Sequence, residues 1–357
     1  MTQADDLAPV VVDAAALQAV ATRLLVNAGM VAESAAIAAR VLVSTDLRGM
    51  HTHGVRLIGL YARRIHAGEI HGAAVPRVVR EANGTALWDG DGGLGHVVSV
   101  KVVEETIRRM QSAHLGISMA VVRNSQHFGG GAYYALLGAE AGFIAIASTN
   151  SVPVMVPPGG RGRRLGNNPI AWGAPASREG GPFVFDIALS ETAGGKVALA
   201  NERGETLPGA WVVDAEGRPG SDPSAFSQGG ALVPLGVHKG YGLALLIEIL
   251  TGVLGGGGIA TEVGLGDVSH VFILVDPQAF LPGDEFPERI GQLAKLMHES
   301  PRADGVERIY LPGERALEHQ AQSLRDGLEL DTVIWKEVKQ AAAAFGCSGE
   351  LQDAIRR

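Results

Sequence analysis

The chain has 357 residues, 46% of them hydrophobic, and this size and composition predict a globular protein with two or more lobes. Its formal net charge is -8 and its Lys and Arg residues are dispersed, which argues against nucleic acid as a partner. The single cysteine, Cys347, excludes an intramolecular disulfide framework and a metal cage built from cysteines. Residues 1–6 are acidic and polar, unlike a signal peptide, and the apolar run 241–254 is too short to cross a bilayer. We therefore expect a soluble cytoplasmic protein without a membrane partner.

Residues 1–75 are predicted to form a helical N-terminal region. The segment 13–28 has apolar residues at helical spacing, with Asp13 as a plausible N-cap and Gly29 as the stop. Two further segments with the same spacing follow it. Helices in the range 311–357 are expected to join this region.

Residues 76–310 carry most of the predicted strands, with helices between them, which is an α/β pattern. The predicted strands are 78–79, 85–89, 117–122, 144–148, 183–186, 271–276 and 308–310. The predicted helices are 98–110, 132–141, 238–254 and 286–300. Residues 201–230 are rich in Gly, Pro and Ser, which predicts an irregular surface segment.

Residues 90–95 form a literal Gly-x-Gly-x-x-Gly sequence between a predicted strand and a predicted helix. That context suits a dinucleotide fingerprint, whose next strand should end in Asp or Glu to bind the ribose. Here the next strand is followed by Arg123 and Asn124. The missing acid favours a structural turn over a Rossmann site.

The densest group of chemically competent residues lies at 44–56, after a predicted helix. It contains His51, His53, Arg48 and Arg56. Arginine presents a planar, permanently charged fork suited to a carboxylate, and histidine exchanges a proton near neutral pH. A polar helix end is the plain structural alternative, and the density of these residues argues against it.

Five further segments carry residues of the same kind, namely 124–129, 166–169, Asp186 at a strand end, 238–242 and 311–314. Together with the His/Arg motif, their order and spacing resemble the malate/L-lactate dehydrogenase family of the second, non-Rossmann type. That family also includes sulfolactate and ureidoglycolate dehydrogenases and Δ1-piperideine-2-carboxylate reductases. The resemblance covers nearly the whole chain.

The resemblance implies an α/β fold in which a non-Rossmann mixed sheet, within residues 76–310, binds NAD or NADP. It implies hydride transfer between this cofactor and a small 2-hydroxy or 2-keto acid of the malate, lactate or sulfolactate type, and it implies a homodimer. A reductase of a cyclic 2-imino acid is the alternative within the family. Two positions depart from the family pattern: Thr52 replaces the Ser of Ser-His-Gly, and residues 187–190 replace Met-Ala-Thr-Ser.

The resemblance also implies roles for the catalytic residues. The histidine of Ser-His-Gly donates the proton, which carries over to His53, and the strand-end carboxylate orients it, which carries over to Asp186. Thr52 is expected to complete the relay through its hydroxyl. Arg48 is expected to bind the substrate carboxylate, with Arg56 as the alternative.

The loop with His127, Phe128 and Gly129 is predicted to contact the cofactor, because the helix N-terminus that follows it suits a phosphate. In some members the equivalent of His127 is the acid/base, so it competes with His53 for that role. Lys239 is predicted to contact the nicotinamide or the substrate. The resemblance implies further cofactor contacts from Ser148, Asn150, Gly313 and Glu314.

Two alternatives stay open. The choice between NAD and NADP is unsettled, and a 2′-phosphate would be favoured if the ribose lay near Arg161, Arg163 and Arg164. A remote alternative is a metal-dependent hydrolase, against which the helical flanking pattern argues, using His51, His53, His127 and Asp186. In the dehydrogenase hypothesis no residue binds a metal, and His51 has no assigned role.

Overall fold

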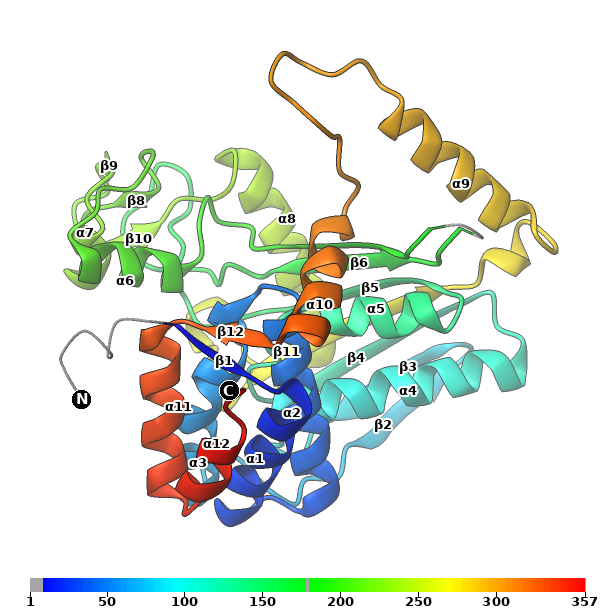
Figure 1. Ribbon diagram of the computed structural model, residues 1–357. Coiled ribbons are helices and arrows are strands. Elements are labelled where there is room, and N and C mark those ends of the chain that lie inside the picture. The colour runs from blue at the N-terminus through cyan, green and yellow to red at the C-terminus, as the bar shows by residue number, and fades with distance from the viewer. Residues whose placement is uncertain (1–8, 178–179, 357) are drawn as a thin grey trace.

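A seven-stranded sheet runs through the centre of the computed structural model, which describes residues 9–177 and 180–356 (Figure 1). The strands are β1 Val10–Val12, β2 Arg77–Ala82, β3 Thr85–Asp89, β4 Ile117–Ser125, β5 Ile144–Thr149, β6 Ile170–Ala174, β7 Phe183–Ile187, β8 Val212–Val213, β9 Pro219–Gly220, β10 Ala231–Leu232, β11 Val268–Val275 and β12 Leu328–Leu330. The helices are α1 Ala14–Asn27, α2 Ala32–Leu47, α3 Ile58–His66, α4 Gly95–Ala113, α5 Ala132–Glu140, α6 Gly194–Arg203, α7 Ser224–Ser227, α8 His238–Glu248, α9 Glu285–His298, α10 Glu314–Asp326, α11 Thr332–Ala344 and α12 Ser348–Asp353. Short helical turns are η1 His51–His53, η2 Val55–Leu57, η3 Ile249–Val253, η4 Ala260–Glu262 and η5 Pro277–Ala279.

The central sheet is mixed, which confirms the predicted fold class. Its strand order is β2-β3-β4-β11-β5-β6-β7, in which β3 and β4 run parallel and the other neighbouring pairs run antiparallel. The apolar strand β11 lies at the centre, with its first five residues buried. Helices α4 and α5 pack against the sheet, and burial of its central strand explains the continuous apolar run at 271–275.

The start and the end of the chain pack together in one helical layer. The Asp13 carboxylate accepts the N–H of Ala16 at 2.9 Å, as its position before α1 predicts. Strand β12 pairs antiparallel with β1, and Trp335 of α11 shares a buried cluster with Leu24 of α1 and Ile58 of α3. Figure 1 shows these blue and red elements side by side. The division of the chain at residues 75 and 310 stays a prediction.

The predicted strand at 308–310 is wrong, because residues 301–311 contain neither a helix nor a strand. Arg308 pairs with Glu314, and its guanidinium lies over the ring of Tyr310, 4.7 Å from the ring centre. Both side chains are exposed, so a run this short does not bury enough apolar surface to join the sheet. Residues 201–230 hold α7 and part of a small three-stranded sheet of β8, β9 and β10, rather than only irregular chain.

The glycine-rich turn at 90–95 packs against the protein's own backbone. A Cβ built on Gly90 would lie 2.8 Å from the carbonyl oxygen of Asn124, and one on Gly95 would lie 2.2 Å from that of Gln126. Only glycine fits such approaches. Backbone therefore fills the space that a phosphate would need, as expected of a structural turn.

Helix α8 and the turn η3 present an apolar face to solvent. Between 45 and 56% of the surface is exposed at Leu243, Leu246, Ile249, Val253 and Leu254. Contiguous exposed apolar surface of this kind commonly marks an interaction site. Within residues 9–177 and 180–356, no helix is both long enough and apolar enough to span a membrane.

Candidate active site

A cavity of about 430 Å³ lies where the η1 turn meets the loop after β4, the ends of β5 and β7, and the start of α6. Its volume is in the range of small-molecule sites. Six of the predicted site residues line it, and they are Thr52, His53, His127, Phe128, Gly129 and Asp186. The fold thus brings together segments that are far apart in the sequence.

The η1 turn is fixed by Asp46, a fully buried carboxylate in the last turn of α2. Its Oδ1 lies 2.9 Å from Nδ1 of His51, and its Oδ2 accepts the N–H of Val55 at 2.6 Å. Burial raises the pKa of the Asp46 carboxyl, and the hydrogen bond from His51 opposes this shift. The same hydrogen bond raises the pKa of His51. His51 therefore acquires a role that its sequence position did not reveal, because it pairs with the carboxylate that fixes the turn.

His53 reaches the cavity from the end of this turn. Its Nδ1 lies 2.9 Å from the Thr52 hydroxyl, which is the contact expected of a relay between these two residues. Burial lowers the pKa of His53, so the imidazole is neutral at neutral pH. Its ring centre lies 5.7 Å from that of His127.

His127 is fixed by a tyrosine that the sequence did not single out. The hydroxyl of Tyr61, on α3, lies 2.7 Å from Nδ1 of His127. Burial raises the pKa of this phenol, so Tyr61 remains protonated and can donate the hydrogen bond. Burial also lowers the pKa of His127 to about 3. The neutral tautomer that accepts from Tyr61 carries its proton on Nε2.

Asp186 lies at the end of β7, against the first turn of α5. Its Oδ2 accepts the N–H of Ala132 at 2.9 Å. Burial raises the pKa of this carboxyl to about 6, while the N–H groups of Ala132 and Gly131 pull it down. Asp186 thus shares the cavity with His53, while its assigned hydrogen bond goes to backbone. Its role as the partner that orients His53 stays a prediction.

A run of glycines forms part of the cavity wall between β4 and α5. Gly129 has a φ of +77°, and a Cβ there would lie 2.5 Å from Nε2 of the buried His96. A Cβ on Gly131 would lie 2.8 Å from Cβ of Ala171. Both positions therefore require glycine, and the wall they form exposes backbone to whatever fills the cavity.

Comparison with known sequences decides the family. A sequence model described as malate/L-lactate dehydrogenase matches residues 12–339. The chain belongs to the malate/L-lactate dehydrogenase family. It is accordingly a dehydrogenase of that type, which confirms the resemblance seen in the motifs.

Relatives in this family differ in substrate. A malate dehydrogenase from Pyrococcus horikoshii is 36% identical over 340 residues, covering 92% of this chain and 93% of the relative. An NAD(+)-dependent ureidoglycolate dehydrogenase from Escherichia coli is 31% identical, covering 87% and 90%. The solved structure of a Δ1-piperideine-2-carboxylate reductase from Pseudomonas syringae is 30% identical, with a TM-score of 0.84, covering 93% and 99%. The fold is therefore that of the family.

The cations predicted to bind the substrate do not line the cavity that contains His53 and His127, called the histidine cavity below. Arg48 is buried, and its Nη1 donates to Oε1 of Gln320 at 3.2 Å. Arg56 pairs with Glu337 at 3.0 Å in an adjoining cavity of about 360 Å³, which Thr52 also lines. Lys239 is exposed in the first turn of α8. Their substrate-binding roles stay predictions.

The cofactor contacts predicted near β5 point into the protein. The Ser148 hydroxyl donates to the carbonyl of Pro169 at 2.5 Å, and the Asn150 amide donates to Glu248 at 3.2 Å. Their neighbours Thr149 and Ser151 line the cavity instead. Alternation along a strand explains this, since side chains of successive residues face opposite sides. The direct contacts of Ser148 and Asn150 with a cofactor stay predictions.

Gly313 and Glu314 lie at the start of α10, away from the described cavity wall. Gly313 has a φ of +94° and packs against the backbone of Val184. A Cβ built on Gly313 would lie 3.0 Å from the backbone nitrogen of Val184. Glu314 accepts the N–H of Leu311 at 2.9 Å and lies 2.9 Å from His298. These contacts begin the helix, and a cofactor contact by either residue stays a prediction.

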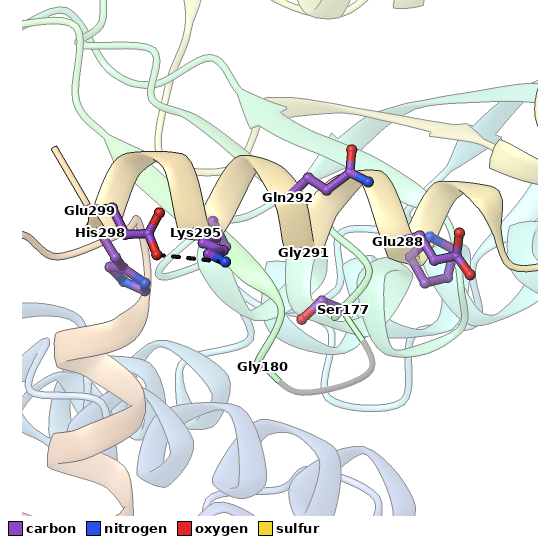
Figure 2. Close-up of a pocket in the computed structure, with 10 residues that line it drawn as sticks. Ser177, Gly180, Glu288, Gly291, Gln292, Lys295, His298 and Glu299 are labelled. Atoms are coloured by element: carbon purple, nitrogen blue, oxygen red, sulfur yellow. Dashed lines mark ion pairs between the residues drawn. The ribbon is translucent and has the colours of Figure 1, made fainter.

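A larger cavity of about 650 Å³ lies between α9 and the chain after β6 (Figure 2). Figure 2 shows Lys295 and Glu299 paired on its α9 side, 3.7 Å apart. Its described lining contains none of the predicted site residues. Among the residues that the structure describes, no group of three His, Cys, Asp or Glu side chains is arranged to hold a metal ion.

Proposed function

We propose that this protein transfers a hydride between NAD or NADP and a small 2-hydroxy or 2-keto acid of the malate, lactate or sulfolactate type. Membership of the malate/L-lactate dehydrogenase family supports this proposal. The observation that carries it is a neutral histidine pair, His53 and His127, at one cavity that glycine backbone also lines. Under this proposal the molecule that binds the protein as its substrate is a small carboxylic acid.

Oxidation of a 2-hydroxy acid requires a base at the hydroxyl and a hydride acceptor at the carbon. Neutral His53 accepts the hydroxyl proton as the carbon–hydrogen bond breaks, and in the reverse direction it returns that proton to the oxygen. The bound nicotinamide supplies hydride acceptance and donation. Thr52, 2.9 Å from Nδ1 of His53, holds the ring in one orientation.

The two histidines differ in a way that favours His53 as the proton carrier. Nδ1 of each ring already has a hydroxyl partner, Tyr61 for His127 and Thr52 for His53, but burial holds the pKa of His127 at about 3. A group this hard to protonate carries a proton poorly near neutral pH. His127 is better suited to donate a hydrogen bond from Nε2 to cofactor or substrate.

The cavity wall is suited to the cofactor. Gly129, Gly130 and Gly131 leave backbone uncovered beside the histidines, and Ser151 and Asn167 supply polar side chains. These residues would hold the nicotinamide end of NAD or NADP. Asp186 would act at His53 as its orienting partner.

A homodimer is part of the same proposal. The family resemblance implies the homodimer, and the exposed apolar face of α8 and η3 is the surface that a second copy of the chain would cover. Replacing Leu246 on this face with Glu should convert the dimer to a monomer in size-exclusion chromatography with light scattering. The unchanged protein eluting as a monomer would refute the dimer.

A second candidate is reduction of a cyclic 2-imino acid, favoured by the likeness to the reductase structure of the same fold. Such a substrate has the same carboxylate and accepts hydride at an equivalent carbon. Assaying pyruvate, oxaloacetate, sulfopyruvate and Δ1-piperideine-2-carboxylate, each with NADH and with NADPH, separates the candidates. We expect the highest kcat/KM with a 2-keto acid. A higher kcat/KM with the cyclic imine would favour the second candidate. No turnover with any of these four substrates would refute both candidates.

A further inference from the structure

We propose that Lys196, in the first turn of α6, binds an anionic oxygen group of the molecule that fills the histidine cavity. The inference rests on the proposed function only for the identity of that molecule. Among the described residues that line the cavity, Lys196 is the only Lys or Arg. The arginines expected to bind the substrate carboxylate lie elsewhere, so the cavity needs another cation for its anionic ligands.

The acidic residues of the cavity wall form no ion pair with Lys196. The Asp186 carboxylate accepts the N–H of Ala132 at 2.9 Å, and Oε1 of Glu191 accepts the N–H of Gly236 at 2.8 Å. In the part of the chain that the structure describes, Lys196 has no ion-pair partner within 4.0 Å. Its ammonium is therefore available to a ligand.

A hydroxyl on the same wall as Lys196 also has no partner among the described residues. Thr192 lines the cavity with only 7% of its surface exposed, and its hydroxyl makes no hydrogen bond with a described residue. The hydroxyl is not among the side-chain atoms that are sealed from solvent without a partner, so it remains accessible from the cavity. Thr192 therefore offers a second free polar group to a ligand at this wall.

The start of α6 adds backbone donors to the same wall. The helix has ten residues, and its N-cap, Ala193, offers no side-chain hydrogen bond. The first N–H groups of such a helix favour an anion. Lys196, Thr192 and this helix start form one wall that would bind carboxylate or phosphate oxygens.

Two ligands of the proposed reaction carry such oxygens. One is the pyrophosphate of the dinucleotide, and the other is the second anionic group of a substrate such as oxaloacetate. Pyruvate lacks that second group. NADH affinity and the ratio of kcat/KM for oxaloacetate to that for pyruvate therefore distinguish the two sources.

The test compares Lys196→Met, Lys196→Arg and Thr192→Val with Lys339→Met, an exposed lysine on α11 as the matched control. A lost charge-assisted contact should weaken binding roughly tenfold. A rise of that size in the Kd of NADH assigns the wall to the pyrophosphate. A fall in the oxaloacetate-to-pyruvate ratio at constant NADH affinity assigns it to the substrate. Lys196→Arg should restore most of either loss, and Thr192→Val should show a smaller loss of the same kind.

The inference is overturned if folded Lys196→Met matches Lys339→Met within twofold in NADH affinity and in the kcat/KM ratio. Failure of the proposed function looks different, because the unchanged protein would then reduce no 2-keto acid. In that case the Kd values of NADH and inorganic pyrophosphate, measured without turnover, still decide the role of Lys196. Equal values in the unchanged protein and Lys196→Met would then overturn it.

Discussion

The carboxylate of Asp46 fills the space that any side chain at Gly54 would need. A Cβ built on Gly54 would lie 2.1 Å from Oδ2 of Asp46, closer than such atoms approach in proteins. Because Asp46 also binds the N–H of Val55 and the ring of His51, the turn that carries His53 is shaped by one buried side chain. Disturbing this pair should therefore move His53.

Replacing Gly54 with Ala should displace the η1 turn. We expect kcat to fall at least tenfold and the free energy of unfolding to fall by about 1–3 kcal/mol, as for other overpacked sites. Gly349→Ala on α12 is the control, because nothing in the described chain outside its own stretch of helix lies within 4 Å of an added Cβ. Denaturant unfolding and steady-state kinetics check both. Normal activity in Gly54→Ala would show that Asp46 does not fix the turn.

The pair of His51 and Asp46 should make stability depend on pH. The pKa of His51 is raised above its ordinary 6.5 by its hydrogen bond to Asp46, so the folded state binds this proton more tightly than the unfolded state. Its contribution is fully present below pH 6.5 and is lost as pH rises through the folded pKa. Replacing His51 with Asn should flatten the stability curve above pH 6.5. An unchanged curve, measured by denaturant unfolding at several pH values, would contradict the pairing.

Replacing Tyr61 with Phe removes the donor to Nδ1 of His127. The acceptor left in a buried site should cost about 1–3 kcal/mol of stability, and NADH should bind more weakly because the tautomer of His127 is no longer fixed. Tyr133→Phe is the matched control, since its hydroxyl bonds Arg40 outside the cavity. Equal NADH affinities in the two variants would show that Tyr61 does not contribute to NADH binding through His127.

Replacing Asp186 with Asn should raise stability at high pH while lowering activity. Burial raises the pKa of Asp186 to about 6, so its contribution to stability declines as pH rises from 3.8 through 6. Asn keeps the acceptor for Ala132 and cannot ionise. The gain, measured as Tm at pH 8 against pH 5, should be larger at pH 8. A variant less stable at pH 8 than at pH 5, relative to the unchanged protein, would contradict this origin of the shift.

Much of the fold could be predicted from local patterns. Asp13 predicts the start of α1, and the apolar run of β11 predicts a buried strand. Both signals can be read from residues that are neighbours in the sequence. The strand predicted at 308–310 was wrong, since Arg308 in this segment forms an exposed ion pair and the segment does not pair with the sheet. Local pattern was thus reliable where burial was extensive.

The site was predictable in its segments and less so in its contacts. The histidines His53 and His127 meet as their motifs imply, but spacing does not tell which side chains of a strand face the cavity, so Ser148 points inward. Tyr61 was missed because it lies in an ordinary helical pattern, and Lys196 because it lies outside the motifs; only the folded chain brings them to the site.

The most direct test of the central claim is the pH profile of 2-hydroxy-acid oxidation, measured with NADH affinity for the unchanged protein, His53→Asn and His127→Asn. Burial holds the pKa of His53 below 6.5, so the unchanged enzyme should lose activity only as pH falls below that value. His53→Asn should lose roughly 10²–10⁴-fold in kcat and lose this acidic limb, with NADH affinity intact. His127→Asn should keep the limb and bind NADH more weakly. The opposite pattern, with His127 controlling the limb and His53 the affinity, would contradict the assignment of His53 as the proton carrier.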